Sequence, residues 1–211
     1  MRKLVVVLMM ILMGTSSAFA DENSRTMEIL EKIEAANSSV KTIQGRFVHG
    51  RISREGTHEA LEGMLYVGSG NMAMHYDKSD QEIFMIQDDR IHMRRKGKAR
   101  DINLKIIRPM QSLKTTLLYS MQGKVASLAK FQPSYAVTAV ENGGDIVIEF
   151  RSMKKGKMGY EVIRNTYDAR SHLIKRMEMV EFNGNSNIYT ISSLSVDKHI
   201  PQKMFYIDLY Q

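Results

Sequence analysis

Apolar positions change their spacing along the chain, and each change indicates a different kind of element. Between residues 24 and 37 they recur three residues apart, with Ser24 available as an N-cap; the positions are Met27, Leu30, Ile33 and Ala36. This spacing predicts one amphipathic helix. From Thr42 onward apolar and polar residues alternate, which predicts strands.

Short alternating runs separated by turn residues follow one another, first over 42–49, 61–67, 71–76, 82–86 and 90–94, and later over 135–140, 146–150, 160–167, 172–182 and 187–196. Strands at this spacing without helices between them indicate antiparallel meanders. The middle of the chain differs, because apolar residues recur at helical steps; these are Met110, Leu113, Leu117 and Met121, with Leu128 in a second short piece between Gly123 and Pro133. We therefore expect a helix, five or six strands, a helical insert and five more strands.

Several strands are apolar on both faces, as the consecutive residues 83–86 show. A sheet covered on one side only alternates cleanly, so something must cover each side. We expect an α+β fold, mostly antiparallel β, in which a curled, incompletely closed barrel of about 10–11 strands has helices plugging its concave side. The chain has no linker-like break, so we assign residues 21–211 to one domain.

The first 20 residues have the pattern of a secretory signal peptide. Arg2 and Lys3 precede an apolar run over residues 4–13, and a small-x-small site ends at Ala20. The run is about half the roughly 20 residues that a membrane-spanning helix needs. We expect cleavage after Ala20 and a periplasmic location.

Charge and cysteine content narrow the classes of protein. The chain has 211 residues and a net charge of +7; loss of the leader removes two basic residues and no acidic one, which leaves 28 Lys and Arg against 23 Asp and Glu, or +5. With no cysteine, there is no disulfide, thiolate zinc site or cysteine nucleophile. Position 21, where a lipid-anchored protein needs a cysteine, is Asp21.

Motifs for catalysis or metal binding are weak. The six histidines form no helical metal pair, Gly68-Ser69-Gly70 is not a nucleophile elbow because Val67 precedes it, and Asp88-Asp89 is typical of a hairpin turn. We expect no enzyme activity, no metal and no cofactor.

Two features leave alternatives open. Methionine occurs 17 times while Trp is absent. Such a composition fits either a Met-rich core or an apolar surface that adapts to different ligands. A basic segment is either a solvated hairpin tip or a surface for anionic headgroups or a membrane-bound partner; nucleic acid is not expected. The candidate partner-docking residues in it are Arg94, Arg95, Lys96, Lys98 and Arg100. Docking through it predicts salt-sensitive association.

The order of elements and several local patterns resemble the LolA family of periplasmic outer-membrane lipoprotein carriers. The similarity is strongest at Leu61-Glu62-Gly63-Met64-Leu65-Tyr66-Val67, and it extends over segments 40–47, 72–76, 88–93 and 200–205. The chain departs from the family pattern where Gly68-Ser69-Gly70 replaces a basic residue and Pro, so no latch Arg can be assigned. Met74 replaces a usual Trp, and Asp89-Arg90 replaces Asp-Gly.

This resemblance implies a curled sheet whose cavity takes up lipid acyl chains, with lipoproteins as cargo, an inner-membrane ABC lipoprotein-releasing transporter as donor, an outer-membrane acceptor, and a monomeric carrier. On this basis the predicted cavity residues are Met72, Met74, Tyr76, Met85 and Met93, and the predicted lid residues are Leu30, Ile33, Leu113, Leu117 and Met121. The alternatives are a carrier or sensor of another amphiphile with the same fold, and a secreted binding protein with a Met-rich core.

Overall fold

The computed structural model describes residues 22–77, 82–95, 97–106, 108–154, 156 and 159–206, without the side chains of 108–111. The predicted leader and the cleavage position after Ala20 lie outside these residues. Among the described residues, no helix has the length and apolarity needed to cross a membrane.

The elements alternate much as the apolar spacing predicts. A helix over residues 22–37 comes first. Six strands follow: β1 (Thr42–Ile52), β2 (His58–Gly68), β3 (Asn71–Tyr76), β4 (Ile83–Gln87), β5 (Arg90–Arg95) and β6 (Lys98–Asn103). Next come α2 (Arg108–Met121) and α3 (Val125–Phe131), then β7 (Tyr135–Asn142), β8 (Asp145–Ser152), β9 (Tyr160–Asp168), β10 (Ile174–Glu181) and β11 (Ser186–Val196), and the short 3-10 helix η1 (Gln202–Phe205).

All eleven strands form one antiparallel sheet in the order β6-β5-β4-β3-β2-β1-β11-β10-β9-β8-β7. Each half is a meander, and β1 joins the halves by pairing with β11 along Ile43–Ile52. The sheet is not closed, because β6 and β7 are its two edges. The predicted α+β fold with an open, curled sheet of 10–11 strands is therefore confirmed.

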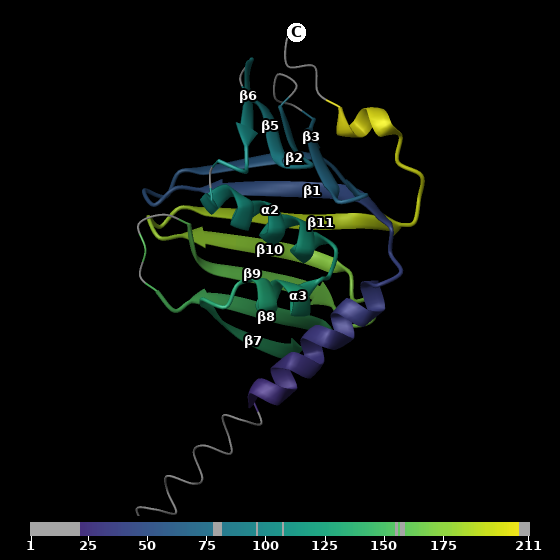
Figure 1. The fold of residues 1–211 in the computed structure, drawn as a ribbon, viewed down its shortest axis with the longest axis vertical. Coiled ribbons are helices and arrows are strands. Elements are labelled where there is room, and N and C mark those ends of the chain that lie inside the picture. Colours follow the sequence, from purple (N-terminus) through teal and green to yellow (C-terminus); the bar gives the residue numbers. More distant parts are fainter. Residues whose placement is uncertain are drawn as a thin grey trace, which may run out of the picture.

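The sheet turns sharply between its two halves, and the helices cover one face. In Figure 1, β7 to β11 and β1 run across the view, whereas β3, β5 and β6 stand steeply above them, with α2 and α3 in front of the sheet. Gly63 lies where β2 meets β3, opposite Phe47 on β1. A Cβ added to Gly63 would stand 2.2 Å from the carbonyl oxygen of His75. The close approach of β3 therefore requires glycine at this position.

The core lies between the helices and the inner face of the sheet. It contains aliphatic and aromatic residues from all three helices and nearly every strand, including Ile29, Phe47, Leu65, Ile86, Val125, Leu128, Ile148, Phe150 and Met177. Burial of this apolar area is the main stabilising contribution to the fold.

A second, smaller cluster lies on the outer face, where β3 and β4 meet η1. It consists of Ala73 and Met85, packed against Tyr66, Ile83 and Phe205. His75 Nε2 lies 2.9 Å from the carbonyl oxygen of Met204, which fixes η1 against β3. The apolar residues on both faces of β3 and β4 thus have two different covers: helices inside and η1 outside.

Candidate functional site

Most of the predicted cavity and lid residues come together inside the sheet. Seven are buried in the core cluster, namely Leu30, Ile33, Met72, Met74, Tyr76, Leu117 and Met121. Met93 and Leu113 are half-buried and pack against that cluster. The inner face of β3 to β5 and the helices above it therefore form one continuous apolar interior.

Met85 does not lie with this group. It pairs with Ala73, whereas Met72 and Met74 pair with Ile86 and Phe84. Residues directly opposite in an antiparallel pair share a face, so Met85 points to the outer face. The structure places it under Phe205 rather than in the interior.

The helix α2 is fixed to the sheet at its C-terminal end. Ser120 is fully buried; its hydroxyl accepts a hydrogen bond from Asn165 Nδ2 at 2.8 Å, and its carbonyl accepts one from the Tyr167 hydroxyl at 2.7 Å. Gln132, just after α3, donates to Thr116 Oγ1 at 2.5 Å. All three contacts lie in the second half of α2, which they attach to β9 and to the end of α3.

The first half of α2 is less buried, and its Lys114 donates to the Asp88 carbonyl oxygen and lies 3.7 Å from the Asp89 carboxylate in the β4–β5 turn. Residues 112–115 are all half-buried, whereas Thr116, Leu117, Leu118 and Met121 are buried. The contacts of the first half therefore lie at the surface, whereas those of the second half are buried.

The N-terminal helix is attached to α3 and to the β9–β10 turn. The Glu34 carboxylate accepts hydrogen bonds from the backbone N–H and the hydroxyl of Ser127, at 2.8 and 2.5 Å. Asn37 Nδ2 donates to the carbonyl oxygen of His172 at 2.9 Å. These bonds hold the helix over the β7 half of the sheet, away from β3 to β6.

At one end of the interior, two arginines and two glutamates form a charged network. Arg51 donates to Glu82 at 2.5 Å and to Glu59 at 3.2 Å, and Arg95 donates to Glu59 at 3.2 Å. The side chain of Glu82 is only 7% exposed. A buried carboxylate requires such partners, because burial without them is costly.

His49 extends this network into the core. Its ring stacks on Tyr189 at 4.2 Å, Nδ1 lies 2.8 Å from the Tyr76 hydroxyl, and Nε2 lies 3.0 Å from Asn187 Oδ1. Burial lowers the pKa of His49 to about 4 and raises that of Tyr76 far above its ordinary value. The neutral imidazole therefore donates from Nε2 to Asn187 and accepts at Nδ1 from Tyr76.

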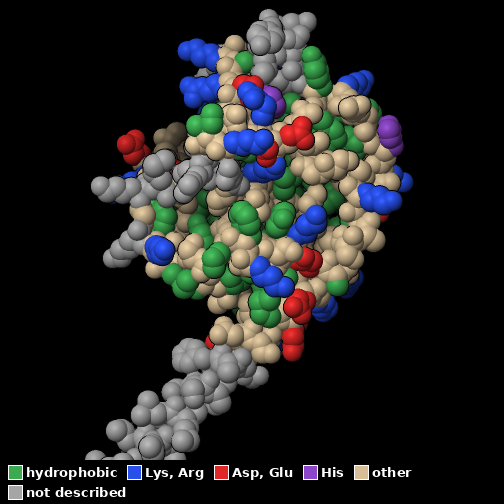
Figure 2. Space-filling view, viewed as in Figure 1, with side chains coloured by type: hydrophobic (Ala, Val, Ile, Leu, Met, Phe, Trp, Pro, Cys, Tyr) green, Lys and Arg blue, Asp and Glu red, His purple; other side chains and the backbone are tan. Residues whose placement is uncertain are grey.

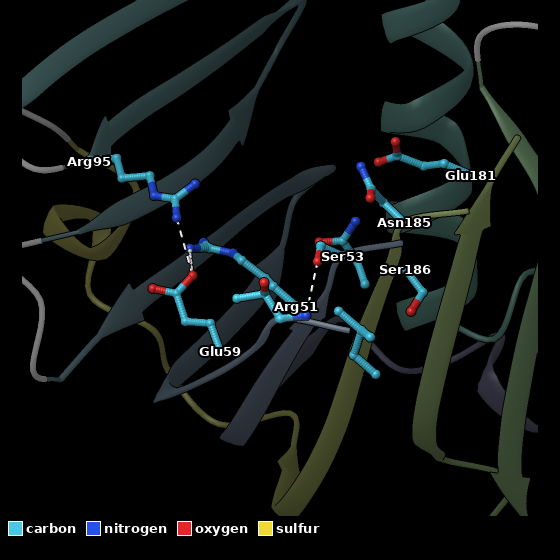
Figure 3. Close-up of a pocket in the computed structure, with 10 residues that line it drawn as sticks. Arg51, Ser53, Glu59, Arg95, Glu181, Asn185 and Ser186 are labelled. Carbon is cyan, nitrogen blue, oxygen red and sulfur yellow. Dashed lines mark hydrogen bonds and ion pairs between the residues drawn. The ribbon is translucent and has the colours of Figure 1, made fainter. Parts of the chain in front are cut away.

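Two clefts open beside the charged network, and Arg95 lines both. One, of about 360 Å³, lies between the β1–β2 and β10–β11 ends of the sheet. Figure 3 shows Arg51 and Arg95 converging on Glu59 there, with Asn185, Ser186 and Glu181 across from them. The other, of about 530 Å³, is lined by Met93, Arg95, Lys98 and Arg100.

The basic segment is divided between the two faces of the β5–β6 hairpin. Arg95 and Lys98 are cross-strand partners, as are Met93 and Arg100, and all four are on the inner face. Arg94 pairs with Ala99 on the outer face and is half-buried. Lys96 lies outside the described residues. Figure 2 shows Lys and Arg side chains gathered at the end of the molecule where Figure 1 places β5 and β6.

Sequence reasoning missed the charged and aromatic network. Phe47, His49 and Arg51 occupy alternate positions of β1, so their common face could be read from the sequence. Their partners Glu82 and Asn187 are distant in sequence and have no local signal. Within the described ranges, no three His, Asp or Glu side chains gather to hold a metal ion.

No family model and no curated protein matches the chain. Among solved structures, it is similar to a LolA superfamily protein from Nitrosomonas europaea, with 11% identity, a TM-score of 0.42, and coverage of 86% of this chain and 97% of the other. It is also similar to a chain of the MucA/MucB complex from Pseudomonas aeruginosa, with 12% identity, a TM-score of 0.47, and coverage of 87% of this chain and 61% of that one. A third similar structure is the lipoprotein LppX from Mycobacterium tuberculosis, with 10% identity, a TM-score of 0.43, and coverage of 84% of this chain and 98% of the other. At these identities and TM-scores the likeness is one of fold alone, and it indicates no family or role for this chain.

Proposed function

We propose that the protein is a periplasmic carrier that shields the acyl chains of lipoproteins. In this role it accepts lipoproteins from an inner-membrane ABC transporter and passes them to an outer-membrane acceptor, without catalysing a reaction. The observation that supports the proposal best is an apolar inner sheet face packed against α2, whose first half is only half-buried and contacts the β4–β5 turn through Lys114.

Acyl chains need such an interior because their exposure to water is costly. Each buried methylene contributes about 0.8 kcal/mol. Two or three chains therefore cannot cross an aqueous compartment without a shield. The sheet supplies the apolar surface. The helices that cover it are separate segments of the sequence.

Loading requires α2 to move, because Met72, Met74 and Leu117 are at most 2% exposed in the closed arrangement. Ser120 holds the C-terminal end of α2 to β9 by two buried hydrogen bonds, whereas Lys114 in the first half reaches the exposed β4–β5 turn, where it contacts Asp88 and Asp89. Exposed contacts of this kind contribute little, so the first half is the end that opens. Methionines beneath it adapt to a ligand at small cost because their side chains are flexible.

Two adjacent residues of β4 offer a matched test. Phe84 and Ile83 are both half-buried, but Phe84 faces the interior and Ile83 faces η1. We expect Phe84→Glu to abolish uptake of a fluorescent acyl lipid and Ile83→Glu to preserve it, with circular dichroism confirming that both variants fold. Equal uptake by the two folded variants would contradict the proposed cavity.

A second candidate function is the carriage of another amphiphile, and the cleft lined by Met93, Arg95, Lys98 and Arg100 favours it. Three cations at the edge of an apolar interior suit cargo with a charged polar end. The acylated end of a lipoprotein has no such charge, since its amine and thiol are both modified.

A further inference from the structure

We infer that the cleft on the inner face of the β5–β6 hairpin binds the anionic, phosphate-bearing headgroup of an amphiphile. This inference rests on the second candidate function above, and it names the headgroup class and the residues that hold it. The cleft has a volume of about 530 Å³, and the described residues that line it are Met93, Arg95, Lys98 and Arg100.

The register of the sheet places cationic and apolar side chains in one row. Arg100 pairs with Met93, Met93 with Phe84, and Phe84 with Met74, so all four share the inner face across β6, β5, β4 and β3. Exposure decreases along this row, from exposed Arg100 through half-buried Met93 and Phe84 to Met74 at 1%. Three strand spacings make the row about 14 Å long.

This gradient matches an amphiphile that lies across the strands. Its headgroup would lie at Arg100 and Lys98, and its acyl chain would pass over Met93 and Phe84 toward Met74. The headgroup would then replace the water at the cations, and the acyl chain would replace the apolar contacts that the helices make in the closed arrangement.

Among the described residues, only one of the three cations in the cleft has an acidic partner. Arg95 is paired with Glu59 at 3.2 Å and lies 3.8 Å from Glu82. Lys98 and Arg100, by contrast, form no ion pair within the part of the chain that the structure describes. Two cations beside an already neutralised arginine leave a local excess of positive charge, which an anion with several acceptor oxygens satisfies.

A phosphate group could come from a lipid headgroup or from free inorganic phosphate. The row from Arg100 to Met74 distinguishes these two ligands. Free phosphate uses only the cations, whereas a lipid also uses Met93 and Phe84. The lipid fits better, because Met93 both lines the cleft and packs, like Phe84, against the core cluster.

The test compares two lipids that differ only in phosphate. Calorimetry measures how tightly the protein without its predicted leader binds lysophosphatidic acid and the monoacylglycerol that has the same acyl group. Binding of inorganic phosphate is measured in the same way. We expect the phosphate-bearing lipid to bind about tenfold more tightly, as one or two charge-assisted bonds imply. The variant K98E/R100E should lose this preference and retain uptake of the monoacylglycerol.

The double variant K198E/K203E is the matched control, since it reverses two exposed lysines far along the chain and changes the net charge equally. It should keep the preference. Equal binding of both lipids, or a preference that survives K98E/R100E, overturns the headgroup site while leaving acyl-chain carriage intact. Inorganic phosphate that binds as tightly as the lipid overturns it in favour of a free anion. If neither lipid binds, both proposals are overturned.

Discussion

At the scale of single residues, Gly63 is required by the close approach of the β3 backbone. An added Cβ would meet the His75 carbonyl oxygen at 2.2 Å and the Phe47 ring at 2.9 Å. Neither group can withdraw cheaply, because one is backbone and the other is core. We therefore expect Gly63→Ala to lower the free energy of unfolding by about 2 kcal/mol or more, measured by urea denaturation.

Gly50 on β1 provides the comparison for this substitution. A Cβ there would find its nearest neighbours at 3.8 Å, an ordinary contact distance. Gly50→Ala should change stability little. Similar losses for the two variants would show that strand glycines in general, rather than the close approach at Gly63, account for the effect.

His49 makes stability depend on pH. Its pKa is about 4 in the folded protein, against about 6.5 in an unfolded chain. As pH falls from 6.5 toward 4, the unfolded chain binds a proton that the folded protein does not, so the free energy of unfolding falls, by about 3 kcal/mol in all. Above pH 6.5 the imidazole is neutral in both states and contributes no pH dependence.

Replacement of the imidazole isolates this contribution. His49→Gln removes the titrating group, while the titrating carboxylates remain in both proteins. We expect the variant to lose less stability than the parent protein between pH 6.5 and 4.5 in chemical denaturation. Parallel pH profiles would show that His49 already binds a proton in the folded state.

The sheet face of a residue could be predicted from the sequence where apolar and polar residues alternate cleanly, and it could not be predicted where they do not. Met72, Met74 and Tyr76 alternate with small or polar residues, and they lie together on the inner face. Residues 83–86 are all apolar, so the pattern there is compatible with either face for Met85. Only its pairing with Ala73 decides the face, and pairing is not a local property.

At the scale of elements, the uneven attachment of α2 predicts uneven protection of its backbone. Residues 112–115 are half-buried, whereas Ser120 is fully buried and bonded to Asn165 and Tyr167. We expect amides in the first half of α2 to exchange with deuterium faster than those near Ser120, measured by hydrogen exchange with mass spectrometry. Uniform protection along the helix would contradict opening from its first half.

Element types were largely predictable from periodicity, because helices and strands bury one face at different spacings. The strand β6 is the exception. Its sequence, Lys98 to Asn103, is half charged and mostly exposed, so it lacks the alternation by which a strand is recognised. It forms because a turn at Gly97, which has a φ of 70°, returns the chain alongside β5.

At the scale of the whole molecule, the two meanders followed from the sequence but their junction did not. Consecutive strands separated by turns pair with one another, so most of the strand order is local. The pairing of β1 with β11 joins residues about 150 positions apart, and nothing in either strand specifies it. That pairing makes one sheet of two halves and thereby creates the long inner face.

In the proposed function, this inner face accommodates acyl chains. Mass spectrometry of the full chain, exported and purified without detergent, tests it directly by identifying what remains bound. Lipoprotein carriage predicts a stoichiometric complex with triacylated peptides. Carriage of another amphiphile predicts a stoichiometric complex with free phosphate-bearing lipids. Protein that is free of acylated ligands, and remains so after incubation with them, would contradict the account.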